Sequence, residues 1–193
     1  MIKKIAFIVF ATLVFVQCAK KEDPFLIENG SIGKLTKHIQ IKQIDSLFAT
    51  DSIVKLNAIE NALGTQGEVE IFRKGGKQLL LITPFEDYNP ESLVNHIQIF
   101  DERFKTAKGI SINSPFKDIK MNYTINDIQT TIGSVIVTLK DSDIYMVYDK
   151  KELPENLRYN PSLKIESSQI PDDAKIKYFM VNWEAEEKAT DSE

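Results

Sequence analysis

The two histidines are the first residues that could bind a metal or act as a base. His38 and His96 belong to no metal-binding spacing such as H-E-x-x-H. With one cysteine in the chain, a zinc site would need carboxylate ligands, and no suitable cluster is apparent. We therefore expect no metal or other cofactor, and we interpret His96 as an ordinary polar residue at the start of a strand.

Three carboxylates could in principle perform hydrolysis. Asp87, Asp101 and Glu102 would resemble the acid pair of glycosidases if they converged. The sequence does not show such convergence, and it contains neither a G-x-S-x-G elbow nor a P-loop. We expect no catalytic residue and no enzymatic activity. An envelope hydrolase that acts on glycan or peptide through carboxylates is the alternative.

Two polar turns could bind ions. The segment "RKGGK", Arg73 to Lys77, could hold an anion on its backbone amides, and the simpler interpretation is a charged hairpin tip. Asp141 and Asp143 could begin a calcium loop, with Glu152 at the twelfth position. The required glycine is missing and the intervening residues resemble a strand, so a hairpin turn is favoured.

Cys18 is the only cysteine and cannot form a disulfide within the chain. It follows a basic start, Lys3 and Lys4, and an apolar run from Ile5 to Val16. A membrane-spanning helix needs about 20 apolar residues, so this run fits a cleaved signal peptide better. We assign residues 1–17 to the signal peptide.

Residues 1–23 resemble a bacterial lipoprotein signal, in which the cysteine after the apolar run becomes the lipidated first residue. Gln17 and Phe15 depart from the usual residues before that cysteine. The resemblance implies a lipid anchor on Cys18 and a location at the outer membrane, on the periplasmic face or the cell surface. A plain secreted protein with a free thiol is the alternative.

Composition indicates one globular domain after the signal. The hydrophobic fraction of 42% and the charged fraction of 27% are ordinary for such a domain. The net charge is −4, and removal of Lys3 and Lys4 with the signal makes it about −6, which disfavours nucleic acid as a partner. We expect a lipidated tether over 18–31, an α+β domain over 32–183 and a disordered acidic tail over 184–193.

Two hairpins and two helices suggest an internal repeat. The segments "GEVEIFRKGGKQLLLIT" from Gly67 and "GSVIVTLKDSDIYMVYD" from Gly133 align without a gap and share apolar positions. Upstream, "IKQIDSLF" and "FKDIKMNY" both have helical spacing, and Ser114 and Pro115 suggest the cap and first residue of the second helix. Late strands follow at "HIQIF" and "KIKYFMVNW". We predict two similar units, 32–101 and 108–183, each a helix packed on an antiparallel sheet with a central hairpin; chance similarity is the alternative.

The stretch "KTAKGISINSPFKDIKMNY" resembles tandem-repeat α+β modules of the β-lactamase-inhibitor-protein type and small outer-membrane assembly lipoproteins. This resemblance implies a sheet with helices on one face and a function in binding other proteins.

The hairpin strands are apolar on both faces. Leu79 to Ile82 and Ile144 to Tyr148 would suit a sheet covered on both sides. The helices would cover one side; the loop with Pro154 and Pro161 would close the other, or that side would stay open for a partner. We predict a non-catalytic binding module, held at the membrane by its lipid, with a protein partner.

Overall fold

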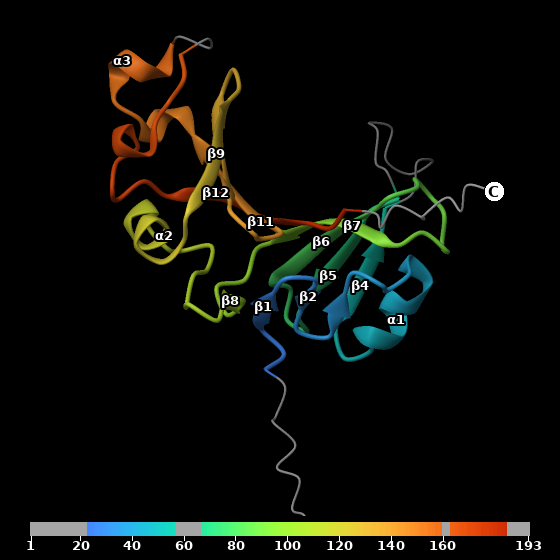
Figure 1. Cartoon of the computed structure of the whole chain (residues 1–193). Coiled ribbons are helices and arrows are strands. Elements are labelled where there is room, and N and C mark those ends of the chain that lie inside the picture. Colours follow the sequence, from blue (N-terminus) through green and yellow to red (C-terminus); the bar gives the residue numbers. More distant parts are fainter. Residues whose placement is uncertain (1–22, 57–66, 160–162, 185–193) are drawn as a thin grey trace, which may run out of the picture.

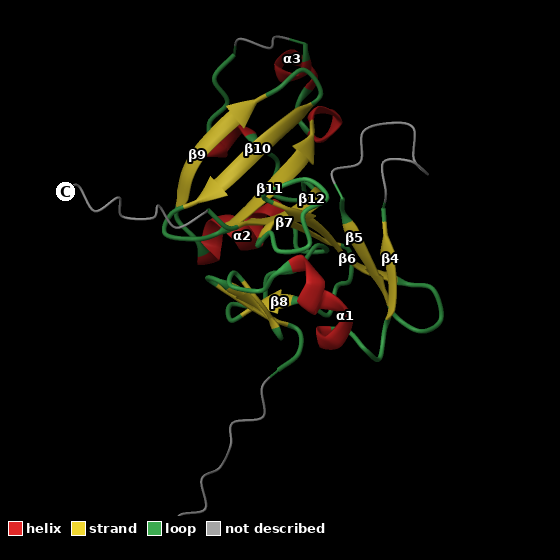
Figure 2. Cartoon of the chain, turned by 90° about the vertical axis from the view of Figure 1, so that its right-hand side faces the viewer, coloured by secondary structure: helices red, strands yellow, loops and turns green. Residues whose placement is uncertain are grey.

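The computed structural model describes residues 23–56, 67–159 and 163–184. The fold is α+β, with mostly antiparallel sheets and few helices, as Figure 2 shows. Cys18 and nearly all of the expected acidic tail lie outside the described residues. Among the residues that are described, no helix has the length and apolar character needed to cross a membrane.

A large antiparallel sheet of eight strands forms the centre of the molecule. Its strand order is β4-β5-β6-β7-β12-β11-β10-β9. In chain order, the first four strands of this sheet are β4 (Ser52–Lys55), β5 (Val69–Phe72), β6 (Gln78–Pro84) and β7 (Val94–Ile99). The other four are β9 (Ile125–Thr130), β10 (Ser134–Leu139), β11 (Ile144–Asp149) and β12 (Ile176–Asn182). Two four-stranded meanders therefore meet where β7 pairs with β12.

A small second sheet lies near the start of the described chain. It contains β1 (Leu26–Glu28), β2 (Ser31–Ile32), β3 (Leu35–Thr36) and β8 (Lys105–Thr106). β1 pairs with β2 in antiparallel fashion and with β8 in parallel fashion. The stretch 18–31, expected as a tether, thus contains β1 and the start of β2, so folded structure begins earlier than the sequence suggested.

The helices are short. The 3₁₀ helix η1 (Ile41–Gln43) continues into α1 (Ile44–Leu47), and α2 (Phe116–Asn122) precedes the second meander. Between β11 and β12 lie η2 (Lys150–Glu152), α3 (Glu155–Arg158) and η3 (Ser167–Gln169). The helical spacing was predicted correctly, because Ile41, Ile44, Phe116 and Ile119 are all buried. The start of α2 differs by one residue, since Pro115 is the N-cap and Phe116 the first helical residue.

One face of the large sheet carries the core. Figure 1 shows α1 and the small sheet against the β4–β7 half and α2 against the β9–β12 half, with α3 on the same side as α2. The buried side chains alternate along the strands, as in Val69 and Ile71 of β5 or Val135 and Val137 of β10. Phe116 packs edge-on against Tyr148, with ring centroids 5.4 Å apart. The loop that contains Pro154 belongs to this covered side, because Leu153 and Leu157 join the same core.

The opposite face is left uncovered by the described residues. The sheet bends between its two halves, so this face is concave in Figure 1. We call it the open face.

Candidate binding surface

The open face is built from residues that lie opposite one another across all eight strands. Strand register places one row of side chains from β4 to β9: Val54, Glu70, Leu81, Gln98, Met180, Tyr145, Thr138 and Asp127. At about 4.8 Å between neighbouring strands, the row extends roughly 34 Å. A patch of about 800 Å², which one protein contributes to a standard interface, has a similar diameter. The row therefore has the dimensions of a protein-binding surface.

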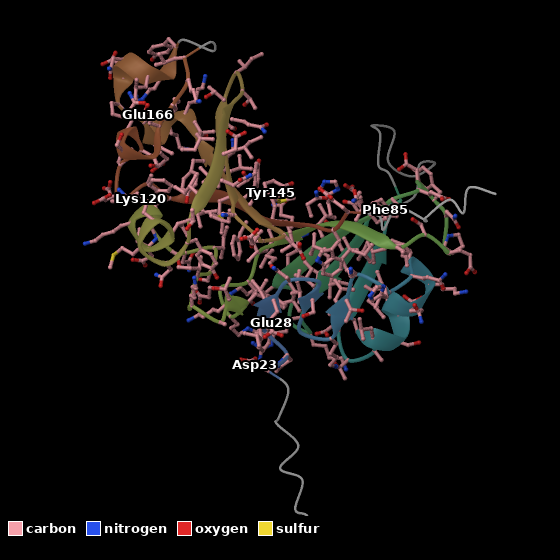
Figure 3. The ribbon with its side chains drawn as sticks, in the orientation of Figure 1. Asp23, Glu28, Phe85, Lys120, Tyr145 and Glu166 are labelled. Carbon is pink, nitrogen blue, oxygen red and sulfur yellow. The ribbon has the colours of Figure 1, made fainter. Side chains whose placement is uncertain are left out.

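The centre of the open face is apolar and aromatic. Met180 and Tyr145 lie opposite each other on β12 and β11, and Val147 lies opposite Tyr178 in the neighbouring row. Tyr178 keeps 40% of its surface exposed. Figure 3 shows Tyr145 at the bend of the sheet, on the side away from Asp23 and Glu28. Half-exposed Tyr and Met side chains are the types enriched at protein interfaces.

Carboxylates occupy both ends of the row. Glu70 accepts a hydrogen bond from Gln78 Nε2 at 3.0 Å on the β5 side. Glu68 lies within 3.5 Å of the Thr83 hydroxyl, which is its donor. At the other end, Asp127 accepts a hydrogen bond from Gln129 Nε2 at 3.1 Å. The open face is therefore acidic at its margins and apolar in the middle.

His96 adds no positive charge to this face. It lies opposite Thr83 on β6 and Asn182 on β12. Burial lowers the pKa of His96 below its usual value, because the charged imidazolium is poorly solvated there. The side chain is therefore neutral at pH 7, in agreement with its interpretation as a polar strand residue.

A hollow opens beside the open face where the β10–β11 turn meets the β1–β2 turn. Its volume is about 800 Å³, and its walls include Asp127, Thr138, Tyr145 and Asn182. Its carboxylates are Asp127, Asp141, Asp143 and Glu184, against Lys37 as its lysine. Burial raises the pKa of Tyr145, so its hydroxyl stays protonated. The hollow joins an aromatic wall to a negatively charged rim, and we call it the acidic hollow.

Asp101 holds a structural ion pair. Its side chain is fully buried and accepts hydrogen bonds from Arg103 Nε at 3.0 Å and Arg103 Nη2 at 3.1 Å. Lys77 Nζ lies 3.3 Å from Asp101 Oδ2, the oxygen that also accepts the hydrogen bond from Arg103 Nη2. Burial alone would raise the pKa of Asp101, but the hydrogen bonds and charges of Arg103 and Lys77 outweigh burial and lower the pKa to about 2. A permanently ionised, fully paired carboxylate is a poor proton donor.

The structure does not bring Asp87 to Asp101 and Glu102. Asp87 lies in the loop before β7, whereas Asp101 and Glu102 follow β7 directly. The six residues of β7 separate the two positions by about 20 Å. Glycosidase carboxylates lie within about 10 Å of one another. These three residues thus do not form the acid pair considered from the sequence.

The two polar turns act as hairpin turns. Gly75 and Gly76, in the turn that connects β5 to β6, have φ angles of 108° and 92°. In the second hairpin Asp141 adopts a φ of 54°. Asp143 Oδ2 accepts a hydrogen bond from the Gly30 amide at 2.5 Å, so that carboxylate fastens the β1–β2 turn to the large sheet. Within the described ranges, no three His, Cys, Asp or Glu residues form a group suited to a metal ion.

The sequence identified the aromatic strands and left two possibilities for the second face of the sheet, closed by the loop with Pro154 and Pro161 or open; the described residues leave it open. The rows depend on the pairing of β7 with β12, which joins residues about 80 positions apart in the chain. Exposed and buried residues alternate in β10 and β11, but Ile144 to Tyr148 are apolar at both sets of positions, so the residue types do not separate the two faces.

Comparison with known proteins adds little to this picture. No family model matches the chain, and no curated protein matches it. Among solved structures, the chain is similar to an uncharacterised protein, yfeY from Escherichia coli, with 16% sequence identity and a TM-score of 0.49. The similarity covers 81% of this chain and 97% of that one. A similarity at this level carries no functional argument.

Proposed function

We propose that this protein is a non-catalytic binding module of the cell envelope, anchored to the outer membrane through a lipid on Cys18, and that its open face binds a partner protein. The observation that carries the proposal is the open face itself. The face is about 34 Å long and has a half-exposed apolar centre that no described element covers, so these apolar side chains do not contribute to the core of the described fold.

We further propose that the chain consists of two similar units, residues 32–101 and 108–183. The strand order supports this proposal, because each unit has a helix followed by four antiparallel strands. The last strands of the two units, β7 and β12, pair with each other at the centre of the sheet. The open face would then be shared equally between the units.

The start of the described chain supports an anchor that leaves the open face accessible. Asp23 and β1 lie on the covered side, away from Tyr145 and the open face (Figures 1 and 3). The residues between Cys18 and Asp23 can reach about 20 Å when extended. A lipid on Cys18 would hold the covered side toward the membrane and direct the open face away from it. Whether that face points into the periplasm or into the medium depends on the leaflet.

The anchor is tested by Cys18→Ser in the full chain. We expect the variant to move from the membrane fraction to the soluble fraction, because the acyl chains supply the membrane affinity. Mass spectrometry of the natural protein should show an acylated Cys18 as its first residue. A variant that still pellets with membranes after a high-salt wash would contradict the anchor.

Binding through the open face is tested by photo-crosslinking in intact cells. A photoreactive phenylalanine derivative replaces Tyr145 or Tyr178 on the open face, or Tyr159 as the control. Tyr159 is 79% exposed and follows α3 on the covered side. We expect one adduct with another protein from both open-face positions and none from Tyr159. Equal labelling at all three positions would indicate random collisions instead of a binding surface.

The alternative of an envelope hydrolase receives no geometric support from the carboxylates that suggested it. Asp101 is engaged by Arg103 and Lys77, and Asp87 lies at the other end of β7.

A further inference from the structure

We propose that the open face recognises a positively charged segment of the partner protein, with apolar contacts at its centre and Lys or Arg side chains toward the carboxylates at its margins. This inference rests on the proposed function and adds the chemistry of the partner.

The charges of the open face point to a cationic partner. In the long row and at the neighbouring positions named above, the charged residues are the carboxylates Glu70 and Asp127, with neither Lys nor Arg among them. Glu68 extends the negative margin next to β5. Burial keeps His96 neutral, and Lys177 at the corner of the face is paired with Asp149 at 3.3 Å, so neither residue offsets these charges.

The acidic hollow strengthens this negative end. It places Asp141, Asp143 and Glu184 beside Asp127, with Lys37 as its basic residue. Asp143 is partly satisfied by the Gly30 amide. A site that combines a cavity with several carboxylates and Tyr145 suits a long cationic side chain. The apolar stem of Lys or Arg packs on aromatic rings while its charged end reaches the carboxylates.

An internal contact already shows this mode of binding at one corner of the face. Lys177 Nζ lies 5.4 Å from the Tyr178 ring centroid and 3.3 Å from an oxygen of Asp149. Lys177 occupies the extra position of a bulge in β12, between the residues that pair with Val147 and Tyr148. The corner is therefore satisfied by the chain itself, whereas among the described residues the hydrogen-bond donors to Glu70 and Asp127, near the two ends of the long row, are the side-chain amides of Gln78 and Gln129.

The same charges disfavour other occupants. Two copies that met through their open faces would bring carboxylates of like sign together, at a cost in free energy. An anionic lipid surface or a nucleic acid would be repelled for the same reason. A basic, convex protein segment is the occupant that satisfies both the apolar centre and the acidic margins.

The test measures how the crosslinked adduct at Tyr145 depends on charge. The double variant Glu70→Lys and Asp127→Lys reverses the margins, and Glu70→Gln with Asp127→Asn neutralises them. The control pair is Glu28→Lys with Asp173→Lys, which changes the net charge equally at exposed positions away from the open face. Circular dichroism and urea unfolding verify that each variant is folded.

We expect the yield of the adduct to fall about tenfold in the reversed variant and by a smaller factor in the neutral variant. The control pair should change the yield little. The crosslinked peptide of the partner, identified by mass spectrometry, should carry Lys or Arg near the attached residue.

Each other result would overturn a specific part of the reasoning. An adduct of unchanged or greater yield in the reversed variant refutes the cationic partner and leaves the binding function intact. An adduct with a second copy of the chain would show that the open face mediates self-association, and it would refute a separate cationic partner. No adduct from Tyr145 or Tyr178 refutes the proposed function, and this inference with it.

Discussion

The ion pair of Asp101 makes a quantitative prediction about stability and pH. Asp101→Asn keeps the shape of the side chain and removes its charge, so Arg103 and Lys77 lose their carboxylate partner. The shift of the Asp101 pKa from 3.8 to about 2 corresponds to roughly 2.5 kcal/mol of differential stabilisation of the ionised form. The side chains of Arg103 and Lys77 are 36% and 55% exposed, and water screens their charges. We therefore expect Asp101→Asn to lower the free energy of unfolding by about 1 kcal/mol.

The sign of the pH dependence follows from the lowered pKa. A carboxyl whose pKa is lower in the folded state stabilises the fold above its unfolded pKa of 3.8, and this contribution is lost as the pH falls through about 2. Urea unfolding of wild type and Asp101→Asn should thus differ by about 1 kcal/mol above about pH 5 and converge as the pH approaches about 2. Asp87→Asn, at an exposed loop position, serves as the control.

Two results would refute this account of Asp101. A difference between wild type and Asp101→Asn that does not change with pH would mean that packing, and not the charge, supports the fold. An equal effect of Asp87→Asn would mean that any lost carboxylate matters equally.

Three further changes test the packing, each by urea unfolding of the purified variant. Leu80→Ala, at a fully buried position of β6, should cost about 3 kcal/mol, and a cost below about 1 kcal/mol would show that β6 is not in the core. Tyr148→Phe should raise stability by about 1 kcal/mol, because the buried Tyr148 hydroxyl has no hydrogen-bond partner among the described residues; a marked loss would reveal such a partner. Gly33→Ala should cost about 2 kcal/mol or more, since Gly33 has a φ of 54° and an added Cβ would lie 2.1 Å from the Pro24 carbonyl oxygen; an unchanged midpoint would show that the β2–β3 turn relaxes freely.

Local signals in the sequence predicted the hairpins and the helix faces well. Gly75 and Gly76 mark the β5–β6 turn because few residues other than glycine adopt their φ angles readily. The spacing of Phe116 and Ile119 located the buried face of α2. These features are determined by residues close together in the chain, so local sequence patterns can predict them.

The edge strands were harder to recognise. β9, "INDIQT", contains Asn, Asp and Gln, which have low strand propensity, and most of its side chains are at least partly exposed. β4 has only four residues and lies at the opposite edge. Each is held by a single neighbouring strand, so pairing and not propensity determines its conformation.

The composition of the open face could not be predicted from local patterns. The apolar pattern of Leu79 to Ile82 and Ile144 to Tyr148 left the second side of these strands either closed by a loop or open, and Leu81 and Val147 lie on the open face. Strand register decides which residues share a face, and register here depends on contacts between distant parts of the chain.

The position of β12 has a consequence for the order of assembly. Of the described strands, β12 comes last in the chain, yet it lies in the middle of the sheet, between β7 and β11. Until residues near 182 are available, β7 and β11 each have a free hydrogen-bonding edge, and Gln98 has no Met180 opposite it. The eight-stranded sheet can therefore close only after β12 has been made, and a truncation before β12 would remove the strand that joins the two halves of the sheet.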